Sequence, residues 1–541
     1  MASHSFATSG SGRGCSAIPP DTTDPGRSSI PATPVSTVGN VRRALPPVLA
    51  LLALLVPAPA FAAGPAPAQV ADRPAGPLRP DGRWVTDRTG RVVVVHGVDL
   101  VARAEPWLPG PAGFGDDDAR LLARAGFGAV RLGVVPAAVM PRPDAIDRAY
   151  LARIVGTVRL LARHGLLTLV VVHQDQWSAR YLGSGLPGWM TRDDGLPAAP
   201  RARSPRGYVT SPGLDRAFKS FWANRPASGG VGLMDRWTQI AGAVARALAR
   251  ERSLVGYDLM NAPWPGPRWQ SCVLDGCAGF QRASLPRLWR RAGAQGRPGG
   301  AGATTRVEPP APPPRLPPPL LPATGDRRRS GLVFQADCGL AAAASAGAAG
   351  LPCGALQATA LDRAVAWSRS AGRPALLTGP AATRRGATVA GLRRIADARM
   401  LSWLRWPYAN VPVRPGDQPG IVRDLGRPAT GANVDEARLG ALDTPYPRLI
   451  AGTPVGWSHA PKTGVFTASW STNLPGGTPA GDGAVSELWL GRRTYPDGYR
   501  LTLTGARVVR RTADRVVVRA LPGAARVTVT ASPPAPARAA S

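Results

Sequence analysis

The stretch "LLTLVVVHQD", residues 166–175, decides the fold of this protein. Its apolar residues run on without alternation and end in the polar residues His173, Gln174 and Asp175. Strands buried on both faces have this pattern, and they occur in parallel sheets that helices cover. The segment before it, "YLARIVGTVRLLARHG" (150–165), repeats apolar residues at helical spacing. Together the two segments predict one helix–strand unit of an α/β fold.

The same unit recurs along the chain. "GRVVVVHGVDL" (90–100) is predicted as one continuous strand, and further buried strands are predicted at 127–135 and 254–261, with helices at 114–126 and 234–251. Polar residues stand at or near the strand ends, where a (β/α)8 barrel builds its site: Asp99, Arg131, His173, Asp175 and Asn261. No G-x-G-x-x-G follows the first strand, which disfavours a dinucleotide-binding fold. We therefore predict a TIM barrel over residues 75–415.

Beyond residue 421 the pattern changes to short alternating strands separated by Gly, Pro and Asp, as in "GVFTASWST" (464–472) and "ARVTVTASP" (525–533). This pattern predicts a C-terminal β-sandwich over residues 421–532, followed by a tail at 533–541. We assign Trp457, Trp470 and Trp489 to the core of the sandwich rather than to a sugar-binding surface.

The amino-acid composition limits the partners that we expect for this protein. The chain has 541 residues, with 66 basic and 34 acidic side chains and a net charge of +32. Almost all the basic residues are arginines, spread along the whole chain, and no nucleic-acid-reading motif accompanies them. We therefore expect no nucleic-acid partner. The spacing of cysteines and histidines does not match a zinc site, so no metal is expected either.

The N-terminus is typical of an exported protein. Arg42 and Arg43 precede an apolar run at 44–56, and the small residues Ala60 and Ala62 provide a cleavage site. Residues 1–62 are therefore predicted to be a leader with a signal peptide, and the mature chain to be secreted. A buried core helix is the alternative for this run.

Export gives the cysteines an interpretation. Outside the leader the chain has four, Cys272, Cys277, Cys338 and Cys353, which an oxidising compartment would pair as Cys272–Cys277 and Cys338–Cys353. Buried free thiols are the alternative.

Residues 288–329 do not fit a barrel pattern. The segment is rich in Pro, Arg and Gly, and this composition predicts no buried face where a helix and a strand should lie. A shifted reading frame or an inserted disordered segment would both explain it.

Several ordered motifs resemble glycoside hydrolase family 5, specifically its endoglycoceramidase-like branch of secreted actinobacterial proteins. They include "VVVHQDQWSARYLGSGLPGW" (170–189), "GYDLMNAPWPG" (256–266), "RPALLTG" (373–379) and "MLSWLRWPY" (400–408), and the similarity spans roughly residues 75–530. The resemblance implies a barrel with a C-terminal sandwich. It also implies hydrolysis of O-glycosyl bonds in glycolipids by a retaining mechanism that needs two carboxylates.

Both carboxylate positions are vacant. The family's acid/base glutamate in N-E-P corresponds to Ala262, and its nucleophile corresponds to Gly379 in "LLTGPAAT". The candidate substitutes are Asp258, four residues before Ala262 on its strand, and Asp337 in the altered sixth-strand motif "FQADC", but an aspartate is shorter than the glutamate it would replace.

The resemblance also carries over a substrate-binding set. It implies that Arg131 supports the nucleophile, that His173 and Asp175 bind sugar hydroxyls, that Asn261 contacts the 2-hydroxyl and that Trp406 is an apolar floor. Trp264 matches the family as well, and Gln335 stands where a site histidine is expected. Structural roles are the alternatives: an ion pair for Arg131, an internally satisfied His173, a loop cap for Asp175, and packing for Trp264 and Trp406.

Two function classes follow. The first is a glycosidase of the endoglycoceramidase type that needs no cofactor and is impaired by the loss of both glutamates. The second is a non-catalytic pseudoenzyme that binds carbohydrate or glycolipid. Both imply a glycan or glycosphingolipid partner, and such a partner would bring the protein into peripheral contact with lipid surfaces. We expect a monomer.

Overall fold

The computed structural model describes residues 73–199, 206–270, 277–294, 305–307, 330–336, 353–379, 387–410 and 419–534. The leader at 1–62 lies outside these ranges, so the signal peptide and export stay predictions. Within the described ranges, every helix is too short or too polar to cross a lipid bilayer. Residues 67–541 form one compact unit.

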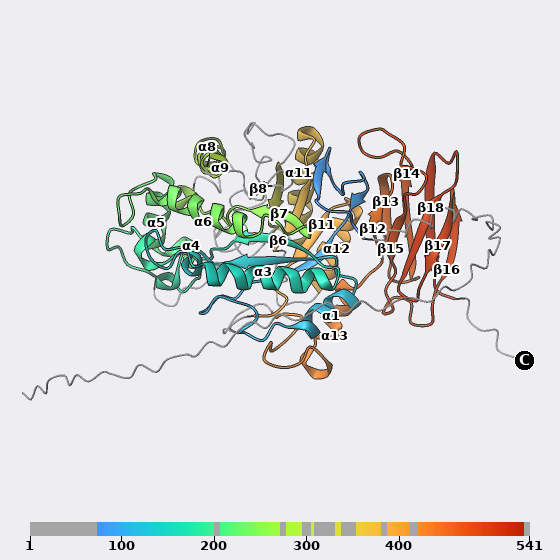
Figure 1. The fold of residues 1–541 in the computed structure, drawn as a ribbon, viewed down its shortest axis with the longest axis horizontal. Helices are drawn as coiled ribbons and strands as arrows, with labels where there is room; N and C mark the ends of the chain where they lie inside the picture. The colour runs from blue at the N-terminus through green and yellow to red at the C-terminus, as the bar shows by residue number, and fades with distance from the viewer. Residues whose placement is uncertain are drawn as a thin grey trace, which may run out of the picture. The chain divides into compact units, whose positions relative to one another are not determined.

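Eight parallel strands close into a barrel, because the last strand pairs with the first (Figure 1). Each strand pairs with its neighbours, for example Arg131 with Asp99 and with Leu169, and the pairing of β6 with β7 is irregular between Thr168 and Leu169. The predicted (β/α)8 barrel is therefore confirmed. In chain order the strands are β4 (His96–Leu100), β5 (Ala129–Val134), β6 (Leu167–Val172), β7 (Leu254–Asp258), β8 (Thr305–Val307), β9 (Ser330–Phe334), β10 (Ala375–Thr378) and β11 (Ser402–Arg405).

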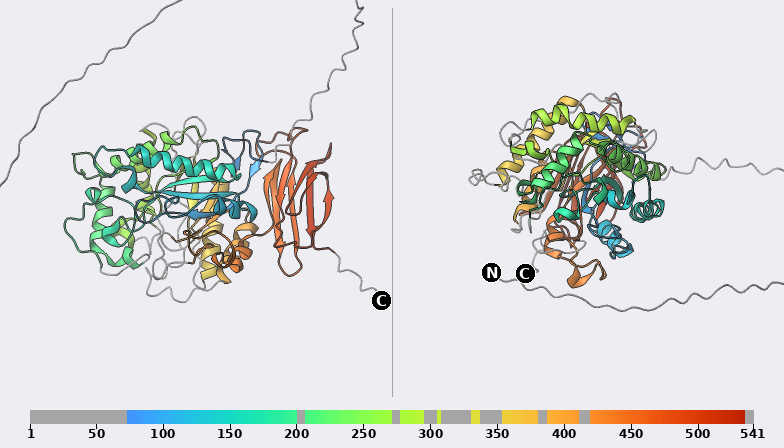
Figure 2. Two further views of the ribbon diagram at one scale, coloured as in Figure 1. Left: turned by 60° about the horizontal axis from the view of Figure 1, so that its bottom comes forward. Right: turned by 90° about the vertical axis from the view of Figure 1, so that its left-hand side faces the viewer.

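Helices surround the barrel strands (Figure 2). Helix α3 (Arg148–Arg163) shows why: its residues Leu151, Ile154, Val158 and Leu161 are buried at helical spacing, and the Asp147 side chain accepts a hydrogen bond from the Tyr150 N–H at its start. The larger helices around it are α1 (Asp116–Arg124), α5 (Pro212–Trp222), α6 (Leu233–Ala247), α11 (Cys353–Ala371) and α12 (Ala387–Ala398).

The C-terminal region is a sandwich of two antiparallel sheets, as predicted. Trp457, Trp470 and Trp489 are buried in its core, which confirms their assignment as core residues. One sheet has the order β1 (Arg79–Asp81), β2 (Trp84–Thr86), β3 (Val92–Val93), β12 (Tyr446–Ile450), β15 (Ser486–Trp489), β18 (Arg515–Ala520) and β17 (Ala506–Arg511). The other has the order β13 (Thr453–Ala460), β14 (Val465–Ser471), β19 (Arg526–Ser532) and β16 (Arg500–Thr504).

The stretch 90–100 is two strands rather than the one predicted. β3 pairs with β12 in the sandwich, whereas β4 pairs with β5 and β11 in the barrel. The structure thus places residues 79–93, which the sequence pattern assigned to the barrel, in a sheet of the sandwich. The apolar run could not show this break, because valines are equally suited to both sheets.

The segment 288–329 contributes more than its composition predicted. Helix α9 (Leu285–Ala294) buries Leu285, Leu288, Trp289 and Ala292 at helical spacing, and β8 pairs with both β7 and β9 to complete the barrel. The expectation that this segment has no buried face is therefore wrong for α9. Residues 295–304 and 308–329 lie outside the described residues.

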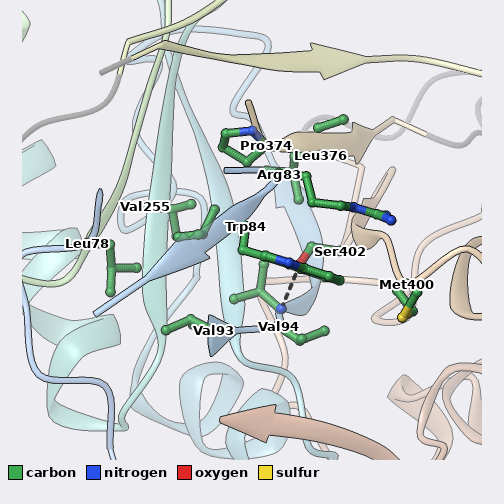
Figure 3. A pocket seen from close by; sticks show the side chains of 13 residues that line it. Leu78, Arg83, Trp84, Val93, Val94, Val255, Pro374, Leu376, Met400 and Ser402 are labelled. Atoms are coloured by element: carbon green, nitrogen blue, oxygen red, sulfur yellow. Dashed lines mark hydrogen bonds between the residues drawn. The ribbon is translucent and has the colours of Figure 1, made fainter. Parts of the chain in front are cut away.

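The N-terminal strands and the sandwich pack against the amino-terminal end of the barrel. Figure 3 shows Trp84 and Val93 lining a small cavity together with Val255 and Leu376, which lie in barrel strands. Nearby, the ring of His96 stacks between Trp403 and Tyr446, with centroid distances of 4.4 and 3.7 Å. Tyr446 also donates its hydroxyl hydrogen to the Gly126 carbonyl at 2.8 Å. This end of the barrel is thus a packed junction.

Candidate functional site

The predicted site residues gather at the opposite end of the barrel. His173 directly follows β6, Gln335 follows β9, Gly379 follows β10 and Trp406 follows β11, while Arg131 lies within β5. The carboxyl ends of parallel barrel strands open on one face, so these side chains share the mouth of the barrel.

Arg131 is the centre of a buried polar network. Its Nη1 donates to Asp99 Oδ2 at 3.2 Å, and its Nη2 donates to Asp258 Oδ2 at 2.5 Å and to Asn261 Oδ1 at 3.0 Å. The Arg131 side chain is only 2% exposed. Arg131 therefore forms its ion pairs and contacts Asn261 at the same time, because one guanidinium carries several hydrogen-bond donors.

Asn261 is fixed in the turn after β7 by Gln174, a residue that the sequence analysis did not single out. Asn261 Nδ2 donates to the Gln174 carbonyl at 2.8 Å. Gln174 Nε2 donates in return to the carbonyls of Asn261 and Ala262, each at 2.8 Å. Gln335 Nε2 reaches Asn261 Oδ1 at 3.2 Å. The only sequence signal for Gln174 was its place between His173 and Asp175 at a strand end.

The two vacant positions share an unusual backbone. Ala262 has φ +42° and Gly379 has φ +56°, both in the left-handed region that side chains disfavour. A Cβ added to Gly379 would lie 3.3 Å from Cδ of Gln335. Gln335 therefore crowds the space where a side chain at position 379 would begin.

The remaining carboxylates near the mouth are already engaged. Asp258 is fully buried and pairs with Arg131, so one of its oxygens is engaged in an ion pair. Burial raises the pKa of Asp99 to about 7 against the opposing attraction of Arg131. Asp337 lies outside the described residues. Within the described chain, Asp258 is thus held as a structural partner rather than as a substitute acid.

His173 has the electrostatics of a neutral ligand-binding group. Burial, together with the nearby charges of Arg131 and Arg103, lowers its pKa to about 3. Neither ring nitrogen has a hydrogen-bond partner among the described residues. A neutral imidazole offers one donor and one acceptor, which is what a sugar hydroxyl requires.

Asp175 and Trp264 both contact Tyr208. Tyr208 donates its hydroxyl hydrogen to Asp175 Oδ1 at 3.2 Å. Trp264 is 2% exposed, and its indole N–H donates to Asp215 Oδ1 at 2.9 Å. Its ring also lies 5.0 Å from Tyr208. The Trp264 ring therefore has a packing role, and neither of its faces is open to a sugar.

Trp406 keeps a more open position. It is half-buried, and the Arg103 guanidinium lies over its ring at 5.7 Å from the centroid. Arg103 was not predicted to be a site residue, and it also faces Asn410, whose Oδ1 it reaches at 3.3 Å.

Within the described ranges, no group of three or more His, Cys, Asp or Glu side chains could hold a metal ion.

Cys277 is disulfide-bonded. Cys272, Cys338 and the side chain of Cys353 lie outside the described residues, so the two pairings stay predictions.

Comparison with known proteins places this site in a family context. Residues 445–530 match the glycoside hydrolase family 5 C-terminal domain. The matched residues include most strands of the sandwich, from β12 into β19. The predicted resemblance to glycoside hydrolase family 5 is therefore confirmed for this part of the chain.

Part of the chain is similar in sequence to endoglycoceramidases. Endoglycoceramidase I of Rhodococcus hoagii (strain 103S) is 34% identical over 209 residues, which are 38% of this chain and 40% of that protein. The endoglycoceramidase of Hydra vulgaris is 27% identical over 215 residues, 35% of this chain and 41% of that protein. The matched part thus spans only about two fifths of the length of these curated relatives.

Solved structures extend the similarity over most of the fold. Endo-glycoceramidase II from Rhodococcus sp., in a cellobiose-like imidazole complex, superposes with a TM-score of 0.65 at 25% identity, covering 83% of this chain and 99% of that chain. An endogalactoceramidase superposes with a TM-score of 0.59 at 19% identity, covering 85% of this chain and 100% of that chain, which shows the fold alone.

Proposed function

We propose that this protein binds the glycan of a glycosphingolipid at the mouth of its barrel without cleaving it. The observation that carries the proposal is the contrast within the site. Arg131, His173, Asn261 and Gln335 are assembled at the mouth, yet positions 262 and 379 hold no carboxylate.

The chemistry of retaining hydrolysis supports the absence of cleavage. One carboxylic acid must protonate the leaving oxygen, and a second carboxylate about 5 to 5.5 Å away must attack the anomeric carbon. Ala262 and Gly379 supply neither group. Asp258 is committed to Arg131, so no proton donor replaces Ala262 from that side.

The ligand class is inferred from the relatives and from the side chains at the mouth. Endo-glycoceramidase II from Rhodococcus sp. has been solved as a ganglioside GM3 complex. In the present chain, the neutral His173 and the amides of Asn261 and Gln335 provide donors and acceptors for hydroxyl groups, and Trp406 provides a ring for a sugar face. Hydrolysis of the same substrate is the second candidate function, which the similarity to endoglycoceramidases favours.

The test uses the full chain and phospholipid nanodiscs that contain lactosylceramide, with ceramide nanodiscs as the reference. We expect saturable binding to the lactosylceramide discs alone, without release of lactose. Asn261→Ala should weaken binding by roughly tenfold, the effect of losing a hydrogen bond or two. Asn473→Ala, at an exposed asparagine of the sandwich, is the matched control and should bind normally.

Equal binding to both kinds of disc would contradict glycan recognition. Release of lactose by the unmodified chain would replace the proposal with the second candidate. Thermal unfolding of each variant separates a loss of binding from a loss of folding.

A further inference from the structure

A second cavity, of about 100 Å³, lies at the opposite end of the barrel from the glycan site. One wall comes from the barrel, at Gly128, Gly165 and Leu167, and another comes from the sandwich strands β12, β15 and β18. The segment around Arg73 closes a third side. Its volume corresponds to roughly three water molecules, so it has room for one small ligand.

The charges around this cavity are unbalanced. Three arginines line it, Arg73, Arg448 and Arg515, whereas Glu487 is the single acidic residue in the lining that the described chain forms. Glu487 Oε1 lies 3.5 Å from Arg448 Nη1 and 3.6 Å from Arg515 Nη1. One carboxylate between two arginines at these distances leaves positive charge in excess, even though Asp514 also approaches Arg515 at 3.5 Å.

The remaining polar groups do not restore the balance. His164 also lines the cavity, but its Nε2 lies 2.6 Å from Asp116 Oδ1, so that carboxylate is engaged outside the lining. Within the described part of the chain, Arg73 forms no ion pair. The excess is therefore borne by side chains from the N-terminal segment and from the sandwich.

Helix ends do not account for the arginines. Helices α1 and α3 both end beside the cavity, and basic side chains often neutralise the last carbonyls of a helix. Here backbone N–H groups already satisfy those carbonyls: Gly126 donates to Ala123, and Gly165 donates to Ala162. The guanidinium groups are thus not required as helix caps.

We propose that this cavity binds a tetrahedral oxyanion, a phosphate or sulfate group, independently of the glycan site. Planar guanidinium groups match the oxygen edges of such an anion and form charge-assisted hydrogen bonds to it. Arg448 and Arg515 belong to the sandwich and Arg73 to the N-terminal segment, so one bound anion links these parts at the base of the barrel.

An anion that binds only the folded chain raises its unfolding temperature by an amount that grows with the logarithm of one plus the ligand concentration divided by the dissociation constant. The test follows thermal unfolding of the full chain with sodium phosphate, sodium sulfate or sodium chloride at equal ionic strength. We expect a logarithmic rise for phosphate or sulfate, of roughly 3 to 5 °C at one hundred times the dissociation constant. Chloride should give no such rise.

Substitutions of the lining arginines test whether the rise in unfolding temperature comes from this cavity. Arg73→Gln changes an exposed side chain and should leave folding intact while weakening phosphate binding about tenfold. Arg448→Met with Arg515→Met should abolish the logarithmic rise and leave only the general stabilisation by an excluded salt. Arg427→Gln, at a side chain that is 77% exposed and remote in sequence from the cavity lining, is the matched control.

Isothermal titration with inorganic phosphate and with dihexanoyl phosphatidic acid identifies the source of the group. Binding of inorganic phosphate indicates a free anion, and binding of the lipid alone indicates a head group. A rise that is equally large in the Arg448→Met, Arg515→Met variant would overturn the proposal, because excluded salts stabilise any folded protein in that way. A titration that shows no saturable binding of either inorganic phosphate or the lipid would overturn it as well.

Discussion

The two ends of the barrel use their polar side chains differently. At the amino-terminal end, the His96 ring stacks on Tyr446 and its Nε2 lies 3.2 Å from Asp397 Oδ1, while Tyr446 donates to the Gly126 carbonyl. At the mouth, His173 keeps both ring nitrogens without a partner in the described chain, and the carboxylate positions 262 and 379 are vacant. The difference shows that the side chains which stabilise the fold are not the ones that would perform chemistry. The barrel and the sandwich are therefore assembled although the catalytic carboxylates are missing.

The largest expected effect comes from rebuilding the carboxylates. We expect no release of glycan from lactosylceramide by the unmodified chain. Ala262→Glu with Gly379→Glu should add little, because the new side chain at 379 meets Gln335 and a left-handed backbone. Adding Gln335→Ala should give measurable release with retained anomeric configuration, since acid–base help alone contributes about 10²- to 10⁴-fold. Chromatography of the released glycan and NMR of its anomer provide the measurement.

The matched control for that experiment is the same triple variant with glutamines at 262 and 379, which should stay inactive. Turnover by the unmodified chain that Asp258→Asn abolishes would contradict the vacancy and identify Asp258 as the acid.

The mouth also contains one structural group, and removing it should have the next largest effect. Arg131→Met leaves Asp99 and Asp258 buried without their cation, so the free energy of unfolding should fall by about 3 to 5 kcal/mol. Arg159→Met removes an ion pair to Glu251 whose arginine side chain is 62% exposed, and should cost less than about 1 kcal/mol. Urea denaturation compares the two. Similar losses would mean that the Arg131 network does not support the fold.

A smaller effect is expected at the junction. Tyr446→Phe removes the hydrogen bond to the Gly126 carbonyl and should lower the free energy of unfolding by about 1 kcal/mol. Glycan affinity should not change, because this residue lies at the other end of the barrel. A change in affinity, measured by titration of lactosylceramide nanodiscs, would show that the two ends are coupled.

The smallest effect concerns pH. Because the pKa of His173 is about 3, well below its usual value near 6.5, the imidazole stays neutral between pH 5 and 8. Glycan affinity should therefore show no step near pH 6.5, and a step there that His173→Gln removes would contradict a neutral His173. The protonation of His173 also changes the free energy of unfolding. As the pH falls, the unfolded chain binds this proton at a higher pH than the folded chain does. The contribution of His173 to the free energy of unfolding is therefore full above pH 6.5 and declines as the pH falls.

Much of the fold and part of the site could be predicted from the sequence. Unbroken apolar runs such as 166–172 specify buried parallel strands, and the residues that end them lie at one mouth for geometric reasons. The helical spacing of Leu285, Leu288, Trp289 and Ala292 was equally readable, but the arginines, prolines and glycines that follow obscured it. Trp264 matched a family motif and is nevertheless buried against Asp215 and Tyr208.

The sequence by itself determined the fold class and the vacancy, because a strand's burial pattern is local and the identity of residues 262 and 379 is a direct observation. Only the tertiary structure decided which groups meet. The pairing of Arg131 with Asp258, the approach of Gln335 to Gly379, and the entry of β1 to β3 into the sandwich each join distant segments. Such contacts depend on how the whole chain packs, and no local pattern of apolar or charged residues encodes the partner.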